Sequence, residues 1–228
     1  MLRRASYDFG RGIDRVRRCM VVAPLVGLLA LPGVAAADDL RYGDHGRAVA
    51  SLQRRLITLG YLDRGEVDGV FGDKTWYAVV ALQGWEQIGR DGVVGSETRR
   101  ALRHARGPQP WRRLRRALEI DLTRQVLLVV ENGAVRRAVH ASTGASKFAT
   151  PDGRFTVIRR ERMSWSRRYH VWLPYALYFY RGWAIHAARL VPSQPASRGC
   201  VRIPIEDAPF VFRASPLGTP VLIRDQAP

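Results

Sequence analysis

The spacing of apolar residues changes once along this chain, and that change limits the folds it can adopt. Apolar residues three or four positions apart form one helical stripe: Val49, Leu52, Leu56 and Leu59. Gly60 then supplies a stop signal for the helix. From Leu118 onward the apolar pattern favours short strands. We therefore expect an α+β protein of two domains, a small three-helix domain over 40–103 and a mainly antiparallel β domain over 118–225.

An internal repeat supports the helical part. The segment 68–75, Asp-Gly-Val-Phe-Gly-Asp-Lys-Thr, recurs at 91–98 as Asp-Gly-Val-Val-Gly-Ser-Glu-Thr. Glycines at matching places predict two equivalent tight turns, each leading into a helix. We expect these helices to begin near Asp73 and after Ser96, whose side chain is a candidate N-cap.

The second half carries hairpin and linker signals. Residues 104–117 contain Pro108, Pro110 and several arginines, which predicts a basic, stiffened linker. Asn132-Gly133 lies between two apolar runs and favours a hairpin, because both central residues of a type I′ turn need a positive φ. The strands expected around it and after it are 126–131, 134–142, 155–159, 169–173, 183–186 and 220–224.

The N-terminus has the pattern of an export signal. A region rich in arginine precedes an apolar run from Met20 to Leu31, and small residues end at Ala37. The run is shorter than the roughly 20 residues that a membrane span needs. We expect residues 1–37 to be a cleaved signal peptide, leaving no stable membrane span and a protein exported to the periplasm or cell wall.

The charge of the chain raises the question of its partners. The formal net charge is +17, which is compatible with binding to nucleic acid or to another anionic polymer. The arginines are scattered through predicted strands, and an exported protein rarely meets nucleic acid. We expect no nucleic-acid partner and favour an anionic polymer of the cell envelope. No His, Cys or Asp cluster has metal-ligand spacing and no phosphate-binding glycine loop occurs, so no metal and no cofactor are expected.

One cysteine remains once the signal peptide is removed. Cys200 has no internal disulfide partner and is therefore either inert or reactive. A reactive thiol needs a base that keeps it ionised, and His186 at the end of a predicted strand can supply one. The amides of Gly199 and Cys200 could hold an oxyanion, and Ser197 could shape the loop.

Arg202 follows the cysteine by two positions and has two possible partners. It could bind a substrate carboxylate or pair with the nearby Glu206 or Asp207.

The helical half resembles the peptidoglycan-binding domain of bacterial wall enzymes. The likeness spans 40–103 and includes Leu52-Gln53, Leu59-Gly60-Tyr61, both Asp-Gly-Val-x-Gly turns, Ala78-Val79 and Leu82-Gln83. It implies a small three-helix unit that binds peptidoglycan. The alternative is that these residues only shape turns and fill a core.

The β half resembles the L,D-transpeptidase catalytic domain of the YkuD type. The likeness covers 118–225 and rests on His186 and the Ser197-Arg198-Gly199-Cys200 segment, together with Gln125, Ser142-Thr143-Gly144, 150–153 and 218–221. It implies that Cys200 is the nucleophile and His186 the general base, oriented by the carbonyl of Ala187. Two positions depart from the family's pattern: Ala187 replaces a Gly or Ser, and Arg198 replaces a His.

Other side chains have weaker claims. Arg198, Tyr169 and Trp172 are candidates for substrate binding. The remaining aromatic residues of this region, Trp165, Tyr175, Tyr178 and Tyr180, are expected mostly to pack. His140 and His170 are expected to be structural or surface residues.

The resemblance implies acyl transfer on peptidoglycan stem peptides, which act as donor and acceptor. A stem amine as acceptor gives an L,D-transpeptidase that forms 3→3 cross-links through a thioester on Cys200. Water as acceptor gives an L,D-carboxypeptidase, and a lipoprotein amine gives an anchoring enzyme. An inactive wall-binding protein is the alternative of another class. A cysteine endopeptidase of the NlpC/P60 kind is disfavoured, because those place Cys before His.

Overall fold

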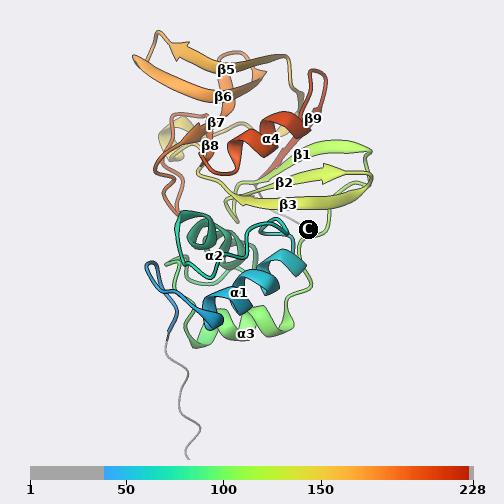
Figure 1. Ribbon diagram of the computed structural model, residues 1–228. Coiled ribbons are helices and arrows are strands. Elements are labelled where there is room, and N and C mark those ends of the chain that lie inside the picture. The colour runs from blue at the N-terminus through green and yellow to red at the C-terminus, as the bar shows by residue number, and fades with distance from the viewer. Residues whose placement is uncertain (1–38, 226–228) are drawn as a thin grey trace, which may run out of the picture. The chain divides into compact units, whose positions relative to one another are not determined.

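The computed structural model describes residues 39–225, which belong to one compact unit. The predicted signal peptide, residues 1–37, lies outside this range. Three helices come first: α1 (Arg47–Thr58), α2 (Asp73–Trp85) and α3 (Ser96–His104). Strands follow, with a short 3-10 helix, η1 (Ser146–Phe148), and one more α-helix, α4 (Ala208–Ala214). Figure 1 shows the helices of the first part beside the two sheets of the second. The predicted α+β class is thus confirmed.

The repeated segments form two matching hydrogen-bond networks, each built on one buried glutamine. In the first copy Gln53 Nε2 donates to Asp68 (2.7 Å), to the Val70 carbonyl (3.1 Å) and to Thr75 Oγ1 (3.0 Å). Its side-chain oxygen accepts the Gly69 N–H at 2.9 Å. The Gln53 side chain of α1 therefore supplies hydrogen-bond partners to the polar groups of the tight turn that leads into α2.

The second copy repeats the four bonds around Gln83. Its Nε2 donates to Asp91 (2.8 Å), to the Val93 carbonyl (3.1 Å) and to Thr98 Oγ1 (3.0 Å). Its side-chain oxygen accepts the Gly92 N–H at 2.9 Å, in the turn before α3. The N-cap position of α3 is Gly95, with no capping side chain, and Ser96 is the first helical residue. The N-cap prediction for Ser96 is therefore wrong, because Gln83 and Thr98 already hold this turn.

Two sheets make up the second half. The first has the order β3-β2-β1-β9-β4 and the second β5-β6-β7-β8. Their strands are β1 (Arg116–Asp121), β2 (Val126–Glu131), β3 (Ala134–His140), β4 (Gly153–Thr156), β5 (Arg159–Ser166), β6 (Val171–Tyr180), β7 (Trp183–Ala188), β8 (Val201–Pro204) and β9 (Pro220–Arg224). The β1–β9 and β7–β8 pairs are parallel, whereas the other pairs are antiparallel, as predicted for most of the domain.

The predicted hairpin forms between β2 and β3. Asn132 and Gly133 have φ values of 52° and 76°, as a type I′ turn requires. The strand expected at 155–159 is instead divided between the sheets: the Val157 N–H donates to Thr219 in the first sheet's loop, and the Ile158 N–H donates to Tyr178 in the second. The chain crosses between sheets here, which alternation in sequence does not show.

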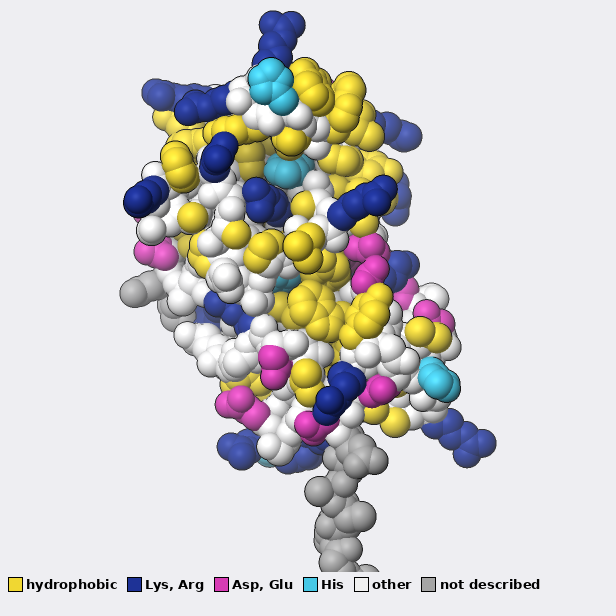
Figure 2. Space-filling model, turned by 90° about the vertical axis from the view of Figure 1, so that its left-hand side faces the viewer, with side chains coloured by type: hydrophobic (Ala, Val, Ile, Leu, Met, Phe, Trp, Pro, Cys, Tyr) yellow, Lys and Arg dark blue, Asp and Glu magenta, His cyan; other side chains and the backbone are white. Residues whose placement is uncertain are grey.

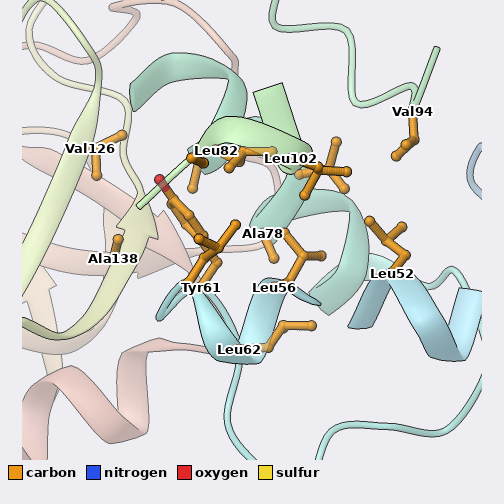
Figure 3. Packing of buried hydrophobic residues seen from close by; sticks show 14 of the residues in the cluster. Leu52, Leu56, Tyr61, Leu62, Ala78, Leu82, Val94, Leu102, Val126 and Ala138 are labelled. Carbon is orange, nitrogen blue, oxygen red and sulfur yellow. The ribbon is translucent and has the colours of Figure 1, made fainter. Parts of the chain in front are cut away.

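Two apolar clusters hold the unit together. One joins the inner faces of both sheets with Ala208 and Val211 of α4. The other contains helical side chains together with Val126, Leu128 and Ala138 of the first sheet. In Figure 3 Tyr61 and Leu82 of the helical part lie beside Val126 and Ala138. The helical and β parts therefore share a core. Within 39–225, no helix is both long and apolar enough to cross a membrane.

Candidate active site

The parallel pairing of β7 with β8 sets the faces of the site. Ile185 lies opposite Val201 and His186 opposite Arg202. Side chains alternate between faces along a strand. Ile185 and Val201 face the buried cluster, so His186 and Arg202 share the other face. Cys200 immediately precedes Val201 and lies diagonally across from His186.

The loop before β8 holds the backbone of Cys200 in place. Gly199 has a φ of 107°, and a Cβ there would meet the Trp183 ring nitrogen at 2.7 Å, so only glycine fits. Ser197 Oγ accepts the Gly199 N–H at 3.1 Å and donates to the Cys200 carbonyl. Thr150 Oγ1 donates to the Gly199 carbonyl at 3.0 Å. Side-chain hydroxyls on both sides thus fix the turn that presents the thiol.

His186 is buried and has one ring nitrogen committed. Its Nδ1 lies 2.9 Å from the Ala187 carbonyl oxygen. A carbonyl only accepts, so Nδ1 carries the proton and Nε2 is the basic nitrogen. The methyl group of Ala187, where the resembled family has Gly or Ser, leaves this contact intact.

Burial makes the resting pair neutral. It raises the pKa of the Cys200 thiol, and the Ala184 N–H and Arg202 oppose this to a smaller degree. Burial also lowers the pKa of His186, which the Ala187 carbonyl opposes and the positive charge of Arg202 reinforces. Both directions favour a thiol beside a neutral imidazole.

Cys200 and His186 line the same cavity, of about 900 Å³. Aromatic and apolar side chains of β5, of β6 and of the turn between them also line it, including Tyr169 in the turn and Trp172 in β6. The charged side chains that line it in the described part of the chain are arginines, namely Arg189, Arg198 and Arg202. In Figure 2 the uppermost part of the molecule shows Lys or Arg side chains, whereas β5 also carries the partly exposed Glu161. The cavity suits an anionic, partly apolar ligand.

The remaining predicted site residues have distinct positions. Arg198 is exposed and its guanidinium lies 5.3 Å from the centre of the Tyr169 ring. Trp172 is 59% exposed and contacts Trp165 edge-on. The Gly199 N–H, expected to face an oxyanion, donates to Ser197 in this structure. Asp207, considered as a partner of Arg202, instead accepts a hydrogen bond from Arg137 at 2.7 Å.

The two other histidines of the domain lie away from the thiol. His140 is buried, its Nε2 lies 3.0 Å from the Pro192 carbonyl, and burial lowers its pKa to about 4. His170 is at the exposed end of the β5–β6 hairpin, edge-on to Trp165. Within 39–225, no group of three or more His, Cys, Asp or Glu side chains could hold a metal ion.

Sequence reasoning gave Ser197 a part in shaping the loop but gave no such role to Gln125 and Thr143, which also support it. The buried Gln125 bonds Thr143 twice, through its Nε2 to Oγ1 at 2.7 Å and through its Oε1 to the N–H at 2.8 Å. The Thr143 carbonyl then accepts the N–H groups of Ala196 and Ser197. The sequence signal for Gln125 and Thr143 was their place in the resemblance to the YkuD-type domain, because no local pattern in the sequence relates Gln125 to Cys200.

Comparison with known proteins agrees with this geometry. The model of the L,D-transpeptidase catalytic domain, YkuD, matches residues 115–223, and that of a peptidoglycan binding domain matches residues 45–102. A segment of 64 residues of this chain is 42% identical to a protein named as a probable N-acetylmuramoyl-L-alanine amidase of Bacillus licheniformis. That match covers 28% of this chain, and the chain spans only 18% of the amidase.

Solved structures extend the likeness to both parts. The L,D-transpeptidase of Stackebrandtia nassauensis has 26% identity and a TM-score of 0.53, over 85% of this chain and 98% of that one. The L,D-transpeptidase of Xylanimonas cellulosilytica has 34% identity and a TM-score of 0.77, over 83% of this chain and 98% of that one. With both sequence models and this structure in agreement, the chain belongs to the L,D-transpeptidase family, with a YkuD-type catalytic domain preceded by a peptidoglycan-binding domain.

Proposed function

We propose that this protein is a cysteine acyltransferase that forms 3→3 cross-links between peptidoglycan stem peptides. The observation that carries the proposal is the shared cavity. A thiol and an imidazole whose basic nitrogen is set by the Ala187 carbonyl line one cavity with three arginines. This is the arrangement that nucleophilic acyl transfer on an anionic peptide needs.

The first half-reaction makes a thioester. His186 Nε2 takes the thiol proton as Cys200 Sγ attacks the carbonyl carbon of the third stem residue. The bond from that carbon to the nitrogen of the terminal D-alanine then breaks, and the imidazolium returns its proton to the departing amine. The acyl group remains on Cys200. The Cys200 N–H is our candidate donor to the oxyanion, because the Gly199 N–H is bonded to Ser197.

The second half-reaction resolves the thioester. The side-chain amine of another stem attacks the same carbonyl carbon, His186 accepts its proton, and the thiolate leaves and is reprotonated. Water in place of the amine gives a tripeptide, which is the carboxypeptidase alternative. A lipoprotein amine gives the anchoring alternative.

The carboxylates of a stem peptide would account for the arginines that line the cavity. A stem peptide carries free carboxylates, and Arg189, Arg198 and Arg202 are the charged groups that face it. Arg198 also stacks on Tyr169, which holds its guanidinium at the cavity wall. We propose that the helical part keeps the enzyme on peptidoglycan, in the periplasm or cell wall. The match of residues 45–102 to the peptidoglycan-binding family model supports that role.

Product analysis tests the reaction. The purified protein is incubated with disaccharide tetrapeptides and the products are identified by mass spectrometry. We expect cross-linked dimers from the wild type and none from Cys200→Ala, whose loss of Sγ removes the nucleophile by a change of one atom. Thr143→Ser, which keeps the hydroxyl that bonds Gln125, serves as a loop variant that should retain dimer formation.

The outcomes separate the alternatives. Tripeptide without dimer would identify a carboxypeptidase, and dimers from Cys200→Ala would contradict the nucleophile. No product from the wild type, together with sedimentation of the protein with isolated walls, would identify a wall-binding protein without this activity.

A further inference from the structure

The loop that joins β7 to β8 connects the two reactive groups. It leaves β7 after His186 and ends at Cys200, and several of its residues line the cavity, among them Arg189, Ala196 and Arg198. Its second half is held by the catalytic domain itself. Ser142 Oγ donates to the Gln194 carbonyl at 2.7 Å, and the Thr143 carbonyl accepts the Ala196 N–H at 3.0 Å.

The first half of the loop is held by a residue of the helical domain. Tyr77, on α2, is 5% exposed. Its hydroxyl donates to the Arg189 carbonyl at 3.3 Å and accepts the Val191 N–H at 3.2 Å. A phenol is both donor and acceptor, so one oxygen serves two loop peptides.

A histidine of the first sheet completes this contact. The His140 ring stacks on Tyr77, with centroids 5.9 Å apart and planes 14° from parallel. His140 Nε2 donates to the Pro192 carbonyl at 3.0 Å, since a carbonyl can only accept. Two stacked rings thus hold the backbone of Arg189, Val191 and Pro192, and Val191 is fully buried beneath them.

The helix that carries Tyr77 is firmly seated on the sheet. A Cβ at Gly84 of α2 would lie 2.4 Å from the Arg124 carbonyl, which measures how closely the helix approaches the β1–β2 turn. The Arg124 guanidinium donates to the Trp85 carbonyl at 3.1 Å and lies over the Trp85 ring. A shift of Tyr77 relative to the loop would therefore require the shared core to open.

We propose that Tyr77 is a positioning residue for substrate binding, through which the peptidoglycan-binding domain builds one wall of the catalytic cavity. By fixing the Arg189 carbonyl, its hydroxyl sets the path of the chain that bears the Arg189 side chain. Cys200 and His186 have separate supports in Ser197, Thr150 and Ala187. Tyr77 therefore acts on binding of the donor peptide and not on the bond-forming step.

The test compares two tyrosine-to-phenylalanine variants that remove the same atom. Tyr77→Phe keeps the ring stacked on His140 and loses only the hydroxyl. Tyr61→Phe is the matched control, because its buried hydroxyl has no hydrogen-bond partner among the described residues. Hydrogen–deuterium exchange of a peptide spanning 189–194, and KM and kcat for the disaccharide tetrapeptide, are measured on the wild type and on both variants.

Loss of two neutral hydrogen bonds predicts a loop that opens more readily. We expect exchange at Val191 to accelerate about tenfold in Tyr77→Phe, KM to rise about fivefold and kcat to stay within about twofold. Tyr61→Phe should match the wild type in all three. The KM and kcat measurements rest on the proposed function, whereas the hydrogen–deuterium exchange measurement does not. Inactivity of the wild type would therefore refute the proposed function, and the exchange measurement would still decide this proposal.

Two results would overturn the proposal. Unchanged exchange at 189–194 would show that Tyr77 does not hold the loop. A lower melting temperature with faster exchange but unchanged KM, or with kcat and KM falling together, would show a structural role without a part in substrate positioning.

Discussion

At the scale of single residues, the arrangement of Cys200 and His186 differs in one respect from the sequence interpretation. The sequence suggested an imidazole that keeps the thiol ionised. The structure buries His186 and half-buries Cys200, which raises the pKa of the thiol and lowers the pKa of His186. A neutral pair costs less to bury than an ion pair, which explains how the site stays intact without substrate.

The neutral pair predicts the pH dependence of catalysis. His186 must be unprotonated to act as base, and its lowered pKa places the acid limb of kcat/KM below pH 6.5. Cys200 keeps most of its proton up to its raised pKa, so the midpoint of the pH-dependent rise in its rate of alkylation by iodoacetamide lies above pH 9.0. Arg202→Gln should move the acid limb upward, because the guanidinium lowers the pKa of His186. Thiol alkylation that saturates below pH 9.0 would instead indicate a preformed ion pair.

At the scale of elements, the helical part is assembled from two copies of one hydrogen-bond network. Gln53 and Gln83 each satisfy a turn and the Thr of the following helix, at distances that agree within 0.1 Å. The repeat therefore has two parts: the glycines that form the tight turns, and the glutamines whose side chains bond those turns. The second network is the more deeply buried, because Gly92 is buried whereas Gly69 is only partly so.

This difference in burial predicts unequal effects of matched substitutions. Gln83→Leu keeps an apolar fit but leaves the Gly92 N–H without a partner and removes one of the two hydrogen bonds of both Asp91 Oδ1 and Thr98 Oγ1. We expect the free energy of unfolding to fall by about 3 kcal/mol, from several lost hydrogen bonds at about 1 kcal/mol each. Gln53→Leu should cost less, and Gln194→Leu, at an exposed side chain, almost nothing. Urea unfolding measures all three, and equal losses for Gln83 and Gln194 would contradict this account of the repeat.

At the scale of the whole molecule, the two sequence domains are joined by burial and by charge. Arg137 of β3 is 2% exposed and pairs with Asp63 and Glu66 of the helical part and with Asp207 before α4. Burial raises the pKa of Asp207 to about 6, so its carboxylate is ionised and paired with Arg137 at neutral pH. Removing one side of such a network leaves a buried charge without compensation.

Truncation tests this mutual dependence. A chain of residues 106–228 lacks the helices that cover Val126, Leu128 and Ala138 and lacks two of the carboxylates around Arg137. We expect it to aggregate or to melt at least about 10 °C below the chain 38–228, since several kcal/mol of core and ion-pair contacts are lost. The control is 38–228 itself, which keeps every described contact. Equal melting temperatures for the two chains would show that the β part is independent.

Local patterns in the sequence predicted the elements whose determinants are local. The Asn132-Gly133 hairpin, the start of α2 at Asp73 and the strand 220–224 were predicted from residues within each segment, and the structure has them. The structure does not have the single strand predicted at 155–159, because its two ends pair with different sheets. Helix α4 was missed as well: it is only seven residues long and is stabilised by packing of Ala208 and Val211 against both sheets.

The sequence by itself determined the two-part architecture, the family, and the identity of Cys200 and His186 as candidates, because apolar spacing and short motifs encode them locally. The tertiary structure alone decided the neutral state of that pair, the cationic cavity, and the link from Tyr77 to Arg189. These depend on burial and on contacts between residues more than a hundred positions apart, and such contacts are selected by the free energy of the assembled core rather than by any local pattern.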